Sequence, residues 1–300
     1  MTIPDATGEA WAEARARSPL RHYGNWHPQW FEYWDGIATQ CRAGDARPRG
    51  LEREIVRHMR QLRMLAPGDR VLDIGCGAGT FALPFARVAA AVTGIDPSEA
   101  MLSRTRRAAA REGIDSLSMI RTTWEEYDPP VDGFDLVFAA FCPGIYDGRT
   151  LLKMERASAR SCCYLAGDVS HFHLLGQLWS QLSGESYSCD AWDIAYPVCL
   201  LRAMGRDPIV RSFRCASRQV ASSNEVIDEF VRYFRSFVDL RQGGRKKIRR
   251  FVEDRSFGGL IDLGRERTIW TVSWEVPGQN DGIFQSREDA CPTCTDHYRP

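Results

Sequence analysis

The segment VLDIGCGAGTF combines an apolar run with glycines at every second position, a pattern typical of a loop that binds a nucleotide-like ligand. Gly75, Gly77 and Gly79 permit unusual backbone dihedral angles and let a ligand touch bare main chain. A dinucleotide-binding loop, G-x-G-x-x-G, would have its third glycine at the position of Thr80. Asp73 precedes the glycines, and its carboxylate suits an ammonium-bearing ligand better than phosphates, which it would repel.

A second carboxylate lies where the next strand is expected to end. Asp96 closes the apolar segment AVTGID, and an acid at that point can accept hydrogen bonds from both hydroxyls of a ribose. Loop, helix, strand and terminal Asp together are harder to meet by chance than the glycines alone. A flavodoxin-like or nicotinamide-binding sheet that uses the same loop is the alternative interpretation.

Alternating strands and helices are predicted around these groups. The expected strands are RVLDIG, AVTGID, LSMIRT, FDLVFAAF and SCCYLAGD, and the helices between them include TFALPFARVA, SEAMLSRTRRAAAREG and RTLLKMERASA. Such alternation predicts a parallel sheet covered by helices on both faces. Later segments predict further helices, SNEVIDEFVRYFRSFVDL and GRKKIRRFVEDR among them, and a closing strand, RTIWTVSWEV.

The segments VLDIGCGAGTF, VTGIDPSEAML and GFDLVFAAF together resemble the class I S-adenosylmethionine-dependent methyltransferases over about residues 50–170. YWDGIA and the stretch from LLRAMGRDPIV to TIWTVSWEV look like a bacterial branch of that family. The resemblance implies an α/β, Rossmann-like, seven-stranded and mostly parallel sheet with helices on both faces, N-terminal helices and late helical insertions. It also implies S-adenosyl-L-methionine as the cofactor and methyl transfer by in-line displacement.

The resemblance further implies which residues hold the cofactor. The first motif would cup the methionine and sugar, the acid ending the second strand would bind the ribose, and the third segment would face the methyl group. The third strand departs from the family, because Thr122 and Thr123 occupy the corner where an acid usually receives the adenine amino group. Here Trp124 would stack on the adenine, and Glu125 or the hydroxyl of Thr123 would accept the hydrogen bond from its amino group. The expected cofactor-binding residues are Asp73, Gly75, Cys76, Gly77, Gly79, Asp96, Pro97, Met101, Thr123, Trp124 and Ala139.

Candidate catalytic residues follow the fourth and fifth strands. Tyr146 lies in AAFCPGIYDG, and His171 and His173 lie in GDVSHFH. A histidine at this edge of the sheet can serve as a general base, although both histidines could instead cap and pack the following helix. Cys142 is a candidate reactive thiol. The acceptor atom, whether O, N, S or C, has no sequence signature.

The expected organisation has four parts. Residues 1–66 form an N-terminal helical lid region, 67–170 the cofactor-binding core, 171–276 helical insertions with the last strands on the substrate side, and 277–300 a flexible tail. The aromatic helix with Trp26, Trp30, Tyr33 and Trp34 is expected to pack over the cofactor, and with the later helices to wall an apolar cavity for a small or medium-sized organic acceptor.

Composition limits the other function classes. Lys plus Arg and Asp plus Glu both total 39, so no global field favours nucleic acid or a membrane. Neither a membrane span nor a secretion signal is evident, and ten cysteines without one predict reduced thiols and a cytoplasmic location. The oligomeric state has no signature.

Two rival functions remain open. The basic run RQGGRKKIRRFVEDR would support a methyltransferase acting on RNA or protein, although such runs are usually solvated helix faces. A non-catalytic protein that binds S-adenosylmethionine is the other possibility. Cys291, Cys294 and His297 have zinc-like spacing but lack a fourth ligand, so we predict no metal site.

Overall fold

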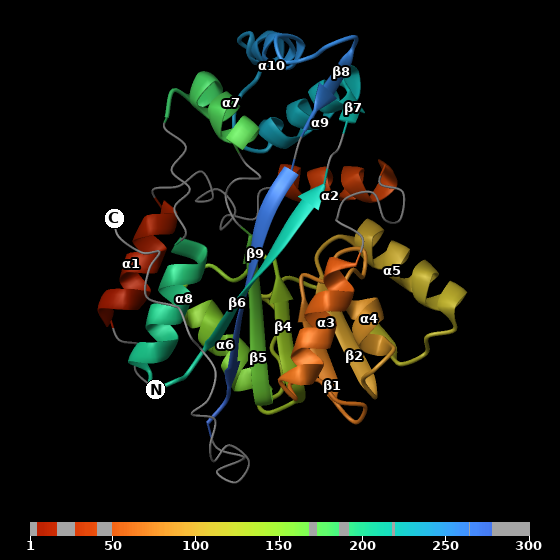
Figure 1. The fold of residues 1–300 in the computed structure, drawn as a ribbon, viewed down its shortest axis with the longest axis vertical. Coiled ribbons are helices and arrows are strands. Elements are labelled where there is room, and N and C mark those ends of the chain that lie inside the picture. The colour runs from red at the N-terminus through yellow and green to blue at the C-terminus, as the bar shows by residue number, and fades with distance from the viewer. Residues whose placement is uncertain are drawn as a thin grey trace.

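The computed structural model describes residues 5–16, 28–40, 50–167, 173–185, 192–217, 220–263 and 265–277 of the chain (Figure 1). The predicted tail after residue 277 lies outside these ranges, as does His171. The statements below concern the described residues.

A seven-stranded sheet forms the centre of the molecule, in the order β3-β2-β1-β4-β5-β9-β6. Its first five strands along the chain run parallel, and β9 is antiparallel to both β5 and β6. This confirms the predicted fold class. The strands are β1 Arg70–Ile74, β2 Ala91–Asp96, β3 Leu117–Arg121, β4 Phe134–Ala140, β5 Ser158–Gly167, β6 Ile209–Ser217 and β9 Arg265–Glu275.

Both faces of the sheet are covered because its central strands are apolar on both sides. Along β4, Leu136 and Phe138 pack into one core cluster, while Val137 and Ala139 pack into the other. The helices on the first face are α3 Leu51–Gln61, α4 Ala82–Ala86 and α5 Glu99–Glu112. Those on the second face are α1 Asp5–Ala16, α6 Gly148–Ala157 and α8 Trp192–Ala203.

A separate group of elements, which we name the cap, lies beyond the carboxyl ends of the parallel strands (Figure 1). It comprises α7 His173–Ser183, α9 Ser223–Arg235, α10 Gly244–Glu253 and the hairpin of β7 Val220–Ser222 with β8 Leu260–Asp262. The cap has its own apolar cluster, which includes Trp179, Phe234 and Phe251. The β7–β8 pair was not predicted, because two three-residue strands leave no periodic signal.

The helix α2, Pro28–Gln40, lies between the cap and the core (Figure 1). On one side it contacts α5, and on the other it contacts α9. Tyr33 and Trp34 pack against the apolar cluster of the cap, and the rings of Tyr33 and Tyr233 meet edge to face at 5.6 Å between centroids. α2 therefore joins the cap to the cofactor-binding core.

Candidate active site

The glycine loop after β1 has the backbone conformation that its sequence requires. Gly75, Gly77 and Gly79 have φ of 69°, 51° and 81°, a region that costs residues with a Cβ about 1–2 kcal/mol. A Cβ on Gly75 would lie 2.9 Å from Sγ of Cys142, and one on Gly79 would lie 2.7 Å from Cγ2 of Thr105. A Cβ on Gly77 would meet nothing within 4 Å. The loop is therefore packed on either side and open at Gly77, where a ligand can reach the main chain.

Asp96, at the end of β2, faces this opening. The backbone N–H of Gly77 donates to its Oδ2 at 3.0 Å, and the N–H of Ser98 donates to its Oδ1 at 2.9 Å. The pKa of Asp96 is raised to about 6, mainly by burial and to a smaller extent by the nearby Asp35, while the two backbone N–H groups act in the opposite direction. Its remaining lone pairs can accept ribose hydroxyls, so the carboxylate fits the cofactor expected from the sequence.

The first turn of α5 is fixed by Ser98. Its hydroxyl accepts the N–H of Met101 at 3.1 Å, as an N-cap residue does, and donates to the carboxylate of Asp35 on α2. Met101 is buried, and Pro97 lies between Asp96 and the N-cap residue Ser98. The segment from Asp96 to Met101 is thus held by the N-cap side chain of Ser98 and by Asp35 of α2.

Asp73 and two cysteines, Cys76 and Cys142, lie at the loop. Asp73 is buried on β1. Burial raises the pKa of Cys142 to about 12 and holds the pKa of Cys76 well above its usual value, with a further contribution to Cys76 from Asp73. Both thiols are therefore neutral at physiological pH. Since the thiolate is the nucleophile, the structure does not favour Cys142 as a reactive group.

The loop after β4 carries Tyr146 and is tied to the N-terminal helix α1. Arg15 donates to the carbonyl of Pro143 at 3.1 Å, and its guanidinium lies 5.3 Å from the ring centroid of Tyr146. Burial raises the pKa of Tyr146, so its phenol is a hydrogen-bond donor near neutral pH. Phe141 has φ of 51°, and this strained residue follows directly after β4 beside Cys142.

Thr123 and Trp124 follow β3, as the sequence predicts. The indole N–H of Trp124 donates to the carbonyl of Thr150 at 3.1 Å, and the ammonium of Lys153 lies 4.6 Å from its ring centroid. Thr123 donates its hydroxyl proton to Glu126 at 3.0 Å. Trp124 is buried against α6. The role of both residues beside adenine stays a prediction.

The other expected site residues are only partly placed. Ala139 is buried on β4, between Ile74 and Tyr164 of the neighbouring strands. His173 begins α7, but its side chain is outside the described part of the structure. Among the described residues, no group of three His, Cys, Asp or Glu side chains could hold a metal ion. Cys291, Cys294 and His297 lie beyond the described ranges.

Sequence reasoning missed Asp35, Ser98 and Arg15. Ser98 is the first residue of the predicted helix SEAMLSRTRRAAAREG, and a serine at a helix start is an N-cap signal that could have identified its role. Asp35 and Arg15 carry no such signal, because they reach the site through contacts between distant parts of the chain.

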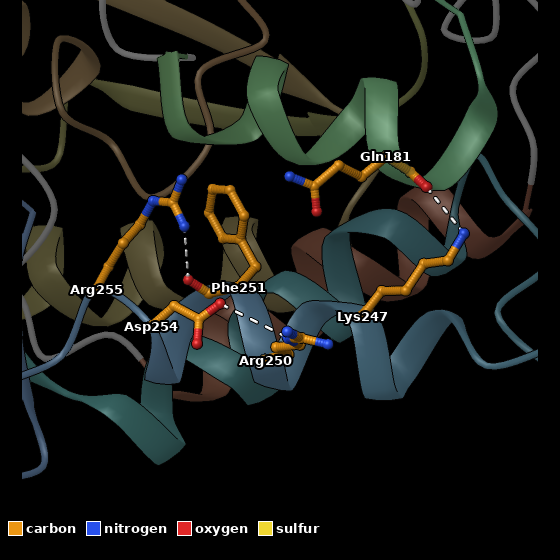
Figure 2. A pocket seen from close by; sticks show the side chains of 6 residues that line it. All are labelled: Gln181, Lys247, Arg250, Phe251, Asp254 and Arg255. Atoms are coloured by element: carbon orange, nitrogen blue, oxygen red, sulfur yellow. Dashed lines mark hydrogen bonds and ion pairs between the residues drawn. The ribbon is translucent and has the colours of Figure 1, made fainter.

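A hollow of about 270 Å³ lies in the cap between α7 and α10 (Figure 2). In Figure 2, the ammonium of Lys247 points to Gln181 and donates to its backbone carbonyl at 3.0 Å. Arg255 lies beside Phe251, and its guanidinium carbon is 3.8 Å from the ring centroid. The lining residues are Gln181, Lys247, Arg250, Phe251, Asp254 and Arg255. The basic run of the sequence therefore forms a cationic hollow with one acid in it.

Comparison with known proteins agrees with this geometry. Residues 71–161 match the family model described as a methyltransferase domain. A 23S rRNA (uracil(1939)-C(5))-methyltransferase of Alkalilimnicola ehrlichii is 39% identical over 130 residues, which are 41% of this chain and 26% of that protein. A ubiquinone biosynthesis O-methyltransferase of a Bradyrhizobium species is 41% identical over 87 residues, which are 29% of this chain and 33% of that protein.

A solved structure of magnesium protoporphyrin IX methyltransferase from Synechocystis, with S-adenosylhomocysteine bound, is 14% identical, with a TM-score of 0.45. The match covers 75% of this chain and 81% of that one.

The fold, the glycine loop, Asp96 and the matched segment define the class. The chain contains a class I S-adenosylmethionine-dependent methyltransferase domain, and the cofactor of this domain is S-adenosyl-L-methionine. The chain spans only about a quarter to a third of the two curated relatives described above. None of the helices in the described ranges has the length and apolarity needed to cross a membrane.

Proposed function

We propose that this chain transfers the methyl group of S-adenosyl-L-methionine to a small or medium-sized organic acceptor. The cofactor supplies a methyl group already activated by a sulfonium. The chain has to bind the cofactor, orient the acceptor in line and exclude water. A base is needed only for an acceptor that is protonated at neutral pH.

The observation that carries this proposal is the Gly77–Asp96 arrangement. Gly77 is open where a Cβ would lie, and its backbone N–H donates to the half-buried carboxylate of Asp96 at 3.0 Å. They combine bare main chain with an acceptor for ribose hydroxyls. In the proposal, Asp73, Gly75, Cys76 and Gly79 surround the methionine portion, and Thr123 and Trp124 flank the adenine.

The class of acceptor is supported by the position of the cap. α2 and the cap lie across the carboxyl ends of the strands (Figure 1), where ligands bind in open α/β sheets. A cover of this kind favours a compact acceptor over a large folded one. Tyr146 is the described candidate for orienting the acceptor, and His171 and His173 are candidates for the base.

The described cysteines are free, which supports the predicted cytoplasmic location. They are Cys76, Cys142, Cys162, Cys163 and Cys199.

The test is calorimetric binding of S-adenosylmethionine and S-adenosylhomocysteine, followed by a transfer assay with radiolabelled methyl groups on a panel of small acceptors. Asp96→Asn should weaken binding about 10–100-fold, since hydrogen bonds to a charged group contribute about 1.5–3 kcal/mol each. The matched control is Asp207→Asn, because Asp207 is exposed and remote from the loop. Wild-type protein that binds neither compound would contradict the proposal.

RNA is a second candidate acceptor, and two observations favour it. The matched segment is 39% identical to part of an rRNA methyltransferase, and α10 carries the cationic hollow (Figure 2). If RNA is the substrate, Lys247→Glu with Arg250→Glu, which reverses two charges of the hollow, should weaken RNA binding at least tenfold, and wild-type affinity should fall steeply with salt. RNA binding that is absent, or that changes neither with the substitutions nor with the salt concentration, would exclude RNA as the acceptor.

A further inference from the structure

A chain of hydrogen bonds runs from α2 to the carboxylate of Asp96, which is proposed to bind the ribose. Asp35 accepts the hydroxyl proton of Ser98, and the backbone N–H of Ser98 donates to Asp96 at 2.9 Å. One turn further along α2, the carbonyl of Ala38 accepts from Arg104 of α5 at 2.6 Å. α2 is therefore fixed at two points to α5, at its N-cap residue Ser98 and at Arg104 in its N-terminal half, and Ser98 is bonded directly to Asp96.

The opposite side of α2 belongs to the cap. Tyr33 and Trp34 pack against the apolar cluster of the cap, next to Tyr233 of α9. Asp35 thus lies beside residues that contact a different part of the molecule. A short rigid helix with these two attachments cannot shift at one end without disturbing the other.

We propose that Asp35 is a positioning residue that, through Ser98, couples the seating of the cap to cofactor binding at Asp96. The inference rests on the proposed function, because the coupling is measured through the binding of S-adenosylmethionine or its demethylated product. Asp35 itself is assigned no contact with the reacting atoms.

The charges at this corner give the coupling a measurable signature. Asp35 is an anion close to a second carboxylate, and it contributes to the raised pKa of Asp96. Removing its charge should lower the pKa of Asp96 and so extend cofactor binding to lower pH. The other titratable groups around the corner are Asp73, Cys76, Cys142, Glu99, Arg104 and Arg121.

Two variants separate charge from contact. Asp35→Asn keeps an oxygen that can accept from Ser98 but removes the charge, whereas Asp35→Ala removes both. Glu32→Gln is the matched control, since Glu32 is an exposed acid on the same helix. Each protein is titrated with S-adenosylhomocysteine across pH 5–8, and hydrogen exchange of α9 is measured with and without that ligand.

The expected results differ among the variants. Asp35→Asn should move the pH midpoint of binding down by about half a unit. The wild type should show ligand-induced protection of α9. Asp35→Ala should abolish this protection and weaken binding about tenfold at pH 7.5, the loss of one hydrogen bond. If the Asp35 variants have the same pH midpoint of binding and the same ligand-induced protection of α9 as Glu32→Gln, this inference is wrong, but the proposed function is not affected. A wild type that does not bind the ligand would overturn the proposed function as well.

Discussion

The backbone N–H of Gly77 donates to the carboxylate of Asp96 at 3.0 Å, which joins the turn after β1 to the end of β2. The same turn is fastened to β2 by the N–H groups of Gly75 and Cys76, which both donate to the carbonyl of Ile95, at 2.9 and 3.0 Å. The glycine loop is therefore held in its conformation by hydrogen bonds of its own backbone. For a cofactor bound as proposed, we expect little rearrangement of the loop and an affinity that depends on the charge state of Asp96.

Cofactor affinity should depend on pH through Asp96. Burial raises the pKa of this carboxyl to about 6, and only the ionised form can accept hydrogen bonds from ribose with both oxygens. Affinity should therefore be constant above about pH 7 and fall as pH drops through 6, approaching tenfold per pH unit below it. Calorimetry with S-adenosylhomocysteine between pH 5 and 8 measures this dependence. A flat profile over that range would show that Asp96 does not titrate there or does not bind the ligand.

Gly77→Ala should remove cofactor binding without unfolding the chain. The added methyl meets no protein atom within 4 Å, so it would enter the space where we propose that the ligand lies. The positive φ of 51° adds a cost of about 1–2 kcal/mol. Gly243→Ala is the matched control, because Gly243 has φ of 82° and equally open surroundings at the start of α10. Both variants should lose similar stability in urea titrations. Equal cofactor affinity in the two would place the ligand elsewhere.

A buried ion pair should contribute strongly to stability and little to binding. Arg206 and Glu155 meet at 2.6 Å with both side chains 8% exposed, and the indole N–H of Trp274 donates to Glu155 at 3.2 Å. Arg206→Ala leaves a buried carboxylate without its cation and should cost about 3–5 kcal/mol of unfolding free energy. The exposed pair of Arg249 and Glu253 supplies the comparison, because Arg249→Ala should cost under about 1 kcal/mol. Similar losses in the two variants would contradict this ranking.

Substitutions at the candidate catalytic residues should separate turnover from binding. His171→Ala or His173→Ala should lower kcat about 100-fold or more if that residue is the general base, with cofactor affinity within about twofold of the wild type. Tyr146→Phe should raise KM for the acceptor, since the raised pKa of Tyr146 keeps the phenol protonated as a donor. These effects are measured with the acceptor found in the transfer assay. Two histidine variants with full activity would remove both residues from the mechanism.

Several features followed from sequence because they are local. The spacing of Gly75, Gly77 and Gly79, the acid at the end of the second strand and the alternation of strands with helices all concern neighbouring parts of the chain. Each has a periodic or conformational signature. The apolar segment SCCYLAGD was likewise predicted to be a strand, and its Cys162 and Cys163 are fully buried on β5.

Other features were decided only by the tertiary structure. β9 is inserted between β5 and β6, and no residue pattern in RTIWTVSWEV specifies its neighbours, since pairing depends on which strand edges remain free. Asp35 meets Ser98 across 63 positions of sequence, and Arg15 meets Pro143 across 128. A single polar side chain on a helix has no local preference that identifies such a partner. Its contact is fixed by how the helices pack, which depends on apolar surfaces distributed over the whole chain.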